Sequence, residues 1–237
     1  PQMPWDGTRL MLADVSYAEM PRLENTRLIA GDRDTLIFQP EFSPDGRWLS
    51  YITSAGEWDA FVLLDLESGE KKRLMHPQGV HLYEPAWLQG MRTYSWRPDS
   101  QSIYFLQNER GFNSLWQVDI HSGNISQIPT QDYSWIRQPT VSSRGELAVI
   151  ATSAQISSRV LVWDGASWRV AARSSAEDIA PEYLSVPQAL EWEGEDGERV
   201  YGLYYPPANP NFFAEGKPPA ILHIHGGPTS QATAKYD

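Results

Sequence analysis

The chain has 237 residues, 41% of them hydrophobic, so it is long enough to bury a substantial core. Acidic residues outnumber basic residues by 30 to 19. The resulting net charge of -11 argues against nucleic acid or an anionic membrane surface as a partner, because both attract clustered Lys and Arg. Cysteine is absent, which excludes a disulfide framework, a thiolate zinc site and a cysteine nucleophile.

Composition favours short β-strands. The sequence contains 10 Trp, 11 Tyr and 7 Phe, with 17 Gly and 18 Pro to break regular structure. Aromatic side chains fit a half-buried pleated surface, while Gly and Pro mark turns. No apolar run approaches the roughly 18 residues of a membrane span, and residues 1–15 lack the pattern of an export signal. We therefore expect a cytoplasmic protein.

An internal repeat extends over the first three quarters of the chain. Residues 42–51, FSPDGRWLSY, match residues 96–105, WRPDSQSIYF, and the apolar run ending at Asp65 matches the run ending at Asp119 at the same spacing of 54. A third copy within residues 138–164 ends at Asp164. Residues 83–87 also match residues 38–42 at a spacing of 45, which places a nine-residue insertion at residues 88–96. A fainter partial copy occupies residues 10–14.

Each copy is predicted to form four strands. In the first complete copy these are residues 36–42, 48–53, 61–66 and 71–74, separated by Gly-containing turns. Four strands in a period of about 40–50 residues are typical of a β-propeller blade. A β-sandwich is the alternative, but sandwiches do not repeat in sequence. We predict a mainly β fold, with three complete four-stranded blades and part of another in residues 1–172. Residues 15–26 would form a turn of the incomplete blade, and Asp65 and Asp119 would be equivalent.

Aspartates at the predicted turns suggest either calcium ligands or local turn contacts. They are Asp45, Asp65, Asp99 and Asp119. A calcium loop needs closely spaced acidic ligands in the D-x-D pattern, which these positions lack. Asp at a turn commonly accepts a hydrogen bond from its own backbone two residues on, and we expect this role here.

The repeat pattern ends near Ala172. Residues 173–187 are polar and are predicted to be a linker, and residues 188–237 would form the start of a second domain. Residues 189–192 and 199–205 read as two strands around Asp196-Gly197, a strong hairpin signal. The nearby acidic cluster is interpreted as an exposed hairpin tip rather than as paired catalytic carboxylates. It comprises Glu193, Glu195, Asp196 and Glu198.

Residues 220–225, AILHIH, are predicted to form a buried strand, and Gly226-Gly227-Pro228 follows at once. His223 and His225 alternate onto one face and could bind a metal, but no further ligand follows closely. Alternatively, paired glycines allow a backbone N–H to approach a reacting carbonyl, as in the loop after strand three of α/β-hydrolases. A plain glycine turn is the third interpretation.

Blade repeats, a linker, a hairpin and then His225-Gly226-Gly227-Pro228 resemble, in that order, the prolyl oligopeptidase family of serine peptidases, above all its dipeptidyl-peptidase and acylaminoacyl-peptidase branches. The resemblance extends over essentially the whole chain and implies a propeller followed by the first strands of an α/β-hydrolase domain. It implies a peptide substrate, no cofactor and no metal. Gly226 and Gly227 would offer backbone N–H groups to an oxyanion, and His225 would support the loop.

The family's other catalytic groups have no match in this sequence. No G-x-S-x-G motif occurs, and the hydrolase order of Ser, then Asp or Glu, then His places the triad beyond residue 237. We therefore expect the 237-residue chain to be inactive and to belong to an active serine peptidase. The alternative is a non-enzymatic propeller scaffold. In either case, unpaired strand edges at the first and last blades would favour self-association.

Overall fold

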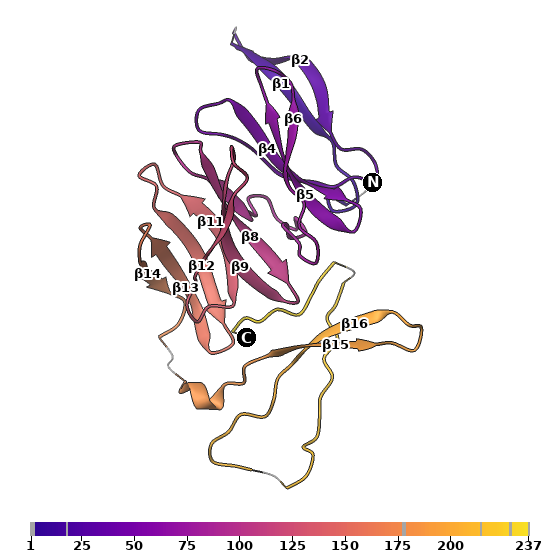
Figure 1. The fold of residues 1–237 in the computed structure, drawn as a ribbon, viewed down its shortest axis with the longest axis vertical. Coiled ribbons are helices and arrows are strands. Elements are labelled where there is room, and N and C mark those ends of the chain that lie inside the picture. Colours follow the sequence, from indigo (N-terminus) through magenta and orange to yellow (C-terminus); the bar gives the residue numbers. More distant parts are fainter. Residues whose placement is uncertain (1–2, 18, 177–178, 214, 228, 237) are drawn as a thin grey trace.

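A computed structural model describes residues 3–17, 19–176, 179–213, 215–227 and 229–236. Three four-stranded antiparallel sheets follow one another along the chain (Figure 1), and in each the strands lie in sequence order. The first blade contains β3 (Ile37–Phe42), β4 (Trp48–Ala55), β5 (Trp58–Asp65) and β6 (Lys71–Met75). The second contains β7 (Tyr94–Trp96), β8 (Ser102–Glu109), β9 (Phe112–Asp119) and β10 (Ile125–Ile128). The third contains β11 (Trp135–Val141), β12 (Leu147–Ser153), β13 (Ile156–Trp163) and β14 (Trp168–Arg173). The predicted partial propeller with three complete blades is confirmed.

Asp65 and Asp119 occupy equivalent positions at the ends of β5 and β9. In each case the carbonyl oxygen of the aspartate accepts a hydrogen bond from the glycine four residues on, at 2.9 Å. The carboxylate accepts the N–H of Ser68 at 3.0 Å in the first blade and that of Ser122 at 2.7 Å in the second. The predicted register between the two repeats is therefore confirmed.

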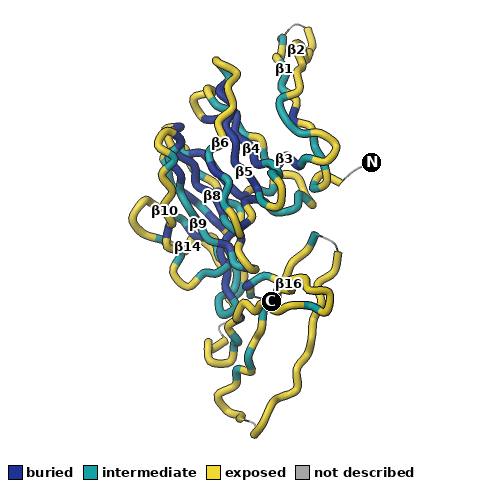
Figure 2. The backbone as a smooth tube through the Cα atoms, turned by 45° about the vertical axis from the view of Figure 1, so that its right-hand side comes forward, coloured by how far each residue is buried: buried dark blue, intermediate teal, exposed yellow. Residues whose placement is uncertain are grey.

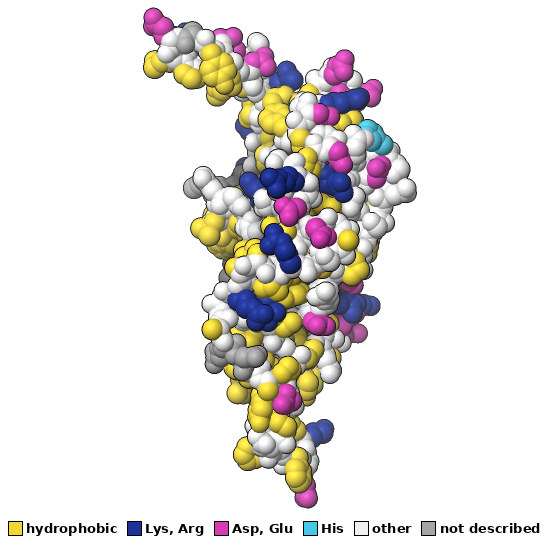
Figure 3. All heavy atoms as spheres, turned by 90° about the vertical axis from the view of Figure 1, so that its left-hand side faces the viewer, with side chains coloured by type: hydrophobic (Ala, Val, Ile, Leu, Met, Phe, Trp, Pro, Cys, Tyr) yellow, Lys and Arg dark blue, Asp and Glu magenta, His cyan; other side chains and the backbone are white. Residues whose placement is uncertain are grey.

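The N-terminal part forms a hairpin of β1 (Leu10–Tyr17) and β2 (Pro21–Ala30). The expectation that residues 15–26 form a turn is wrong, because most of them extend these two strands. Polar and apolar residues alternate there, and antiparallel pairing provides their backbone hydrogen bonds. Hydrophobic side chains remain exposed at this end of the molecule (Figure 3), among them Tyr17, Met20 and Leu23.

The insertion in the second repeat lies elsewhere than predicted. Residues 94–96, placed within the insertion from sequence, form β7 and pair with β8. The additional length falls in the connection of residues 76–93, before the sheet begins. This connection is fixed by a two-way backbone bridge between His81 and Asn108, with N···O distances of 2.9 and 2.8 Å.

Hydrophobic side chains of the blades point alternately to the two faces of each sheet. On β5, Phe61 and Leu63 pack against the second blade, whereas Val62 and Leu64 pack toward β1–β2. This period of two, with both faces covered, explains why the blade strands read as nearly continuous apolar runs. Figure 2 shows the buried residues concentrated in the blades.

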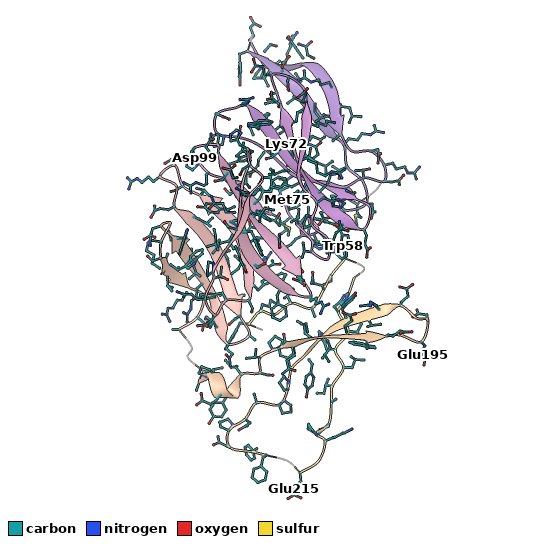
Figure 4. The ribbon with its side chains drawn as sticks, in the orientation of Figure 1. Trp58, Lys72, Met75, Asp99, Glu195 and Glu215 are labelled. Carbon is teal, nitrogen blue, oxygen red and sulfur yellow. The ribbon has the colours of Figure 1, made fainter. Side chains whose placement is uncertain are left out.

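Polar contacts also join the first two blades. Lys72, labelled in Figure 4, donates from Nζ to the carbonyl oxygen of Ile120 at 2.7 Å. Gln39 donates from Nε2 to the carbonyl oxygen of Tyr94 at 2.7 Å. These bonds satisfy backbone groups at the blade boundary that apolar packing alone would leave without a partner.

The chain then leaves the blades through a short 3-10 turn (Pro181–Tyr183) and forms a separate hairpin of β15 (Gln188–Glu193) and β16 (Arg199–Tyr204). The acidic cluster lies at and beside the tip of this hairpin, where Figure 4 labels Glu195, so that prediction is confirmed.

In the described residues no helix is long and apolar enough to cross a membrane.

Residues 220–225 do not form the predicted buried strand. They are irregular, and the side chains of Ile221 and Leu222 are 97% and 82% exposed. An extended segment becomes a strand only when a neighbour satisfies its backbone hydrogen bonds. In the part of the chain that the structure describes, no strand pairs with this segment.

Candidate active site

A cavity of about 640 Å³ is lined jointly by blade residues and by residues of the C-terminal part of the chain. Residues of the third blade and of the connection between the first two blades line one side, and residues of the C-terminal part of the chain, including the HG loop (residues 223–227), line the rest. The first group comprises Glu84, Trp135, Arg137 and Ala154, and the second comprises Ser185, Tyr205, His223, His225, Gly226, Ser230, Gln231, Ala232, Thr233 and Lys235. This volume lies within the range of about 300–1,000 Å³ that is common for ligand sites.

The two glycines of the HG loop are open to solvent. A Cβ placed on either Gly226 or Gly227 would have no heavy atom within 4 Å. Gly227 adopts a left-handed conformation with φ of 72°, which favours glycine over residues with a side chain. Pro228, the last residue of the predicted motif, lies outside the described residues. The geometry leaves the backbone of this loop accessible to a molecule in the cavity.

His223 and His225 both line this cavity, as their alternation in sequence suggested. Among the described residues no group of three or more His, Asp or Glu side chains is arranged to hold a metal ion. The two histidines therefore line the same cavity as Gly226.

Glu84 and Arg137 form an ion pair on the opposite wall. Their closest atoms, Oε2 and Nε, are 3.7 Å apart, and Asn113 donates a long hydrogen bond of 3.4 Å to Glu84. Burial raises the pKa of the Glu84 carboxyl, while Arg137 and Asn113 act in the opposite direction. A partly desolvated carboxylate facing a cavity is a typical feature of ligand sites.

Sequence reasoning did not identify this charged pair, although a signal was present. Glu84 precedes Pro85 at the position where the first and third repeats have Gln39-Pro40 and Gln138-Pro139. Both glutamines take a left-handed φ, of 47° and 55°, beside an irregularity in strand pairing. In the sequence alignment an acidic residue thus replaces an amide, although in the structure Glu84 lies in the connection before β7 and not beside a strand irregularity.

The turn aspartates act locally, as expected. The carboxylates of Asp45 and Asp99 accept backbone N–H groups two residues on, at 3.1 and 3.0 Å. The hydroxyl of Ser43 and the backbone N–H of Arg47 lower the pKa of Asp45. The pKa of Asp119 is also lowered, and the largest cause is the hydrogen bond from the backbone N–H of Ser122. These aspartates lie at blade turns and not around the cavity.

Known proteins match this chain in both sequence and structure, although no protein-family model does. Dipeptidyl-peptidase 5 of Porphyromonas gingivalis is 26% identical over 199 residues, which are 80% of this chain and 27% of that protein. The crystal structure of puromycin hydrolase superposes on all of this chain with a TM-score of 0.86 and 28% identity. The chain covers 35% of that structure, so it spans about a third or less of these relatives.

A more distant match gives the fold alone. Prolyl oligopeptidase B from Galerina marginata is 8% identical, with a TM-score of 0.61 over 83% of this chain and 27% of its own. The blade repeats, the fold and the two nearer relatives all point the same way, and the chain is similar to peptidases of the prolyl oligopeptidase family.

Proposed function

We propose that this chain forms the propeller-side wall and the oxyanion loop of a serine peptidase, which hydrolyses peptide or acyl-peptide bonds by acyl transfer. The observation that carries the proposal is the position of the HG loop, whose glycine backbone borders a cavity facing Glu84 and Arg137 on the blades. The two relatives are named a dipeptidyl-peptidase and a puromycin hydrolase, and both names denote hydrolytic enzymes.

In this proposal the loop stabilises the developing negative charge on the carbonyl oxygen of the substrate. Backbone N–H groups at Gly226 and Gly227 donate to the oxyanion, and His225 supports the loop without transferring a proton. The nucleophilic serine, the acid and the general base belong to sequence outside these 237 residues. No cofactor takes part in such a reaction. The division into a partial propeller (1–172), a linker (173–187) and the start of a hydrolase domain (188–237) is part of the same proposal.

The test uses Gly226→Val in the full-length protein that carries this chain. A side chain at Gly226 meets no atom within 4 Å, so the variant should fold. The branched side chain would nevertheless crowd the approach of a substrate to the loop backbone. We expect kcat to fall at least about 10²-fold, comparable to the loss of one oxyanion donor. Ala220→Val adds methyl groups to the same exposed segment and serves as the matched control, with kcat unchanged.

The outcomes separate the peptidase from the scaffold alternative. Turnover of peptide amides by the full-length wild-type protein, lost in Gly226→Val only, supports the proposal. An unchanged kcat in that variant removes the oxyanion assignment. Absence of turnover by the full-length protein favours a non-enzymatic scaffold, and turnover by the purified 237-residue chain would contradict our assignment of the triad to sequence outside it.

The isolated chain is also proposed to self-associate, and its cytoplasmic location stays a prediction. The outer face of the third blade exposes Ile150, Val160 and Val170 to 41%, 37% and 42%. The corresponding faces of the first two blades are covered by the next blade. Exposed apolar sheet faces and unpaired edges favour association. Light scattering that shows a monomer at high concentration would contradict this proposal.

A further inference from the structure

Residues 231–236, which follow the HG loop, lie across the ends of the second and third blades. We call this segment the strap. Its Ala234 is completely buried, although most of the tail is exposed. In Figure 1 the C-terminal end of the chain accordingly lies at the ends of the blades.

Hydrogen bonds from both blades hold the strap. Ala234 donates its N–H to the carbonyl oxygen of Gly111 at 2.8 Å, and its carbonyl oxygen accepts the hydroxyl of Ser134 at 2.6 Å. Farther along, Tyr236 donates its N–H to Oγ1 of Thr152 at 3.2 Å. The strap thus uses groups at the β8–β9 turn, before β11 and on β12.

Close backbone contact at Gly111 shows that this docking is tight. Gly111 has a φ of 86°, and a Cβ there would lie 2.8 Å from the carbonyl oxygen of Ala232. Any side chain would therefore collide with the backbone of the strap. Only glycine provides both the left-handed conformation and the close approach.

A reciprocal amide pair joins the start of the strap to the second blade. Asn108 donates from Nδ2 to Oε1 of Gln231 at 2.9 Å, and Gln231 donates from Nε2 to Oδ1 of Asn108 at 3.3 Å. Asn108 is only 8% exposed, and its backbone forms both hydrogen bonds of the bridge to His81. The amide of Asn108 is therefore held on a rigid support before it meets Gln231.

Among the residues that the structure describes, no hydrogen bond from another part of the chain reaches residues 223–227. Gly226 and Gly227 have open space around them, and Gln231 is the fourth residue after Gly227. Gly226 and Gln231 line the same cavity. After Gly227, the amide pair is the first hydrogen-bonded contact to a blade that the described part of the chain makes.

We propose that the Asn108–Gln231 pair is a positioning device that fixes the oxyanion loop relative to the propeller. This inference rests on the function proposed above and names two positioning residues for that reaction. Small displacements of a group that stabilises a transition state reduce the rate of the chemical step far more than they weaken substrate binding. Loosening the pair should therefore lower kcat and leave KM nearly unchanged.

The experiment compares Asn108→Ala, Gln231→Ala, the double alanine variant and the swapped pair Asn108→Gln with Gln231→Asn, all in the full-length protein. We expect each single variant to lower kcat about 10-fold, within the range for misplaced groups, and the double variant to lose no more than the worse single variant. The swapped pair keeps two amides and their combined length, so it should recover kcat to within about 3-fold of wild type.

A second measurement follows the strap directly. Hydrogen exchange of the Ala234 amide, which is bonded to Gly111, should accelerate in the alanine variants and return to the wild-type rate in the swapped pair. An unchanged kcat and unchanged exchange in Asn108→Ala would overturn the proposal. A higher KM at constant kcat would also overturn it, because that result indicates direct substrate contact by Gln231.

The two levels of inference fail differently. If the wild-type full-length protein cleaves peptide amides but the alanine variants do so equally fast, the positioning role is wrong and the proposed function stands. If the wild-type protein is inactive, the proposed function fails and the catalytic role of the pair fails with it, whereas the exchange measurement still reports whether the pair holds the strap.

Discussion

Replacing Tyr94 by Phe tests whether the boundary between the first two blades depends on one buried hydroxyl. Tyr94 lies on β7, its side chain is fully buried, and its hydroxyl contacts the first blade. The oxygen is 2.9 Å from Oγ and 3.1 Å from the carbonyl oxygen of Ser50, and it also donates to the carbonyl oxygen of Gln39. The substitution removes this oxygen and leaves the ring packing against Phe61 in place.

The expected loss follows from how many hydrogen bonds the phenol can make. A phenol has one proton to donate, so the variant loses one donated bond, worth about 1 kcal/mol net. A buried carbonyl oxygen also loses that partner, and an unsatisfied buried polar group costs about 1–3 kcal/mol. We expect the free energy of unfolding to fall by about 2 kcal/mol.

Tyr104→Phe is the matched control. Tyr104 is only 2% exposed and lies on the next strand of the same blade, but its hydroxyl accepts a single hydrogen bond, from Arg97 at 3.3 Å. Urea unfolding of the two variants, with equal m-values, should give a loss below about 1 kcal/mol for this control. A Tyr94→Phe loss no larger than that of Tyr104→Phe would refute the role of the hydroxyl at the blade boundary.

Three further predictions concern charge and backbone conformation. Backbone N–H groups of its turn lower the pKa of Asp119, so the ionised carboxylate stabilises the fold above about pH 4, and this stabilisation is lost as the pH falls through the lowered pKa. The midpoint of urea unfolding should therefore decrease less on acidification in Asp119→Asn than in the wild type. The hydrogen bond to Asp59 raises the pKa of His81, so the protonated imidazole stabilises the fold fully below about pH 6.5, and this stabilisation is lost as the pH rises through the raised pKa. In Asp59→Asn, an NMR titration should give a lower pKa for His81 than in the wild type. Gly111→Ala should speed amide exchange in the strap, whereas Gly123→Ala, with a similar φ but open space, should not.

The blades could be predicted from sequence because their determinants are local and repeated. Strand 48–53 was recognised by alternation and by the Pro44-Asp45-Gly46 turn before it, and β4 begins at Trp48 as expected. Turn contacts such as that of Asp65 involve residues only two or three positions away. Repetition then gave three independent views of each element, which outweighs ambiguity in any single copy.

The errors arose where structure depends on distant partners, and a one-residue difference between turns was also not visible from the repeat spacing. In the first repeat, the N–H of Ser43 donates to the carbonyl oxygen of Trp48, five residues on. In the third repeat, the N–H of Ser142 donates to the carbonyl oxygen of Glu146, only four residues on. The third blade turn is therefore one residue shorter, and such a shift exchanges the two faces of a strand unless a bulge compensates. Pairing of β12 with β13 indeed contains an irregularity between Ala151 and Ser153.

The candidate site shows the same division between local and distant determinants. The HG loop could be identified as a candidate because its glycines directly follow an apolar run in the sequence. Glu84 and Arg137, by contrast, belong to segments more than 50 residues apart and meet only through blade packing. The strap was invisible for the same reason, since Asn108 and Gln231 are 123 positions apart.

The strap also explains how an exposed tail can line a cavity of defined shape. An isolated extended segment loses conformational entropy of about 1–2 kcal/mol per fixed backbone residue and recovers none of it through packing if its side chains stay in water. Residues 221–224 are in this situation, because Ile221 and Ile224 are 97% and 77% exposed. By contrast, the strap buries Ala234 and exchanges hydrogen bonds with two blades. The blades therefore fix the strap, and in our proposal this contact positions the HG loop between the strap and the hairpin β15–β16.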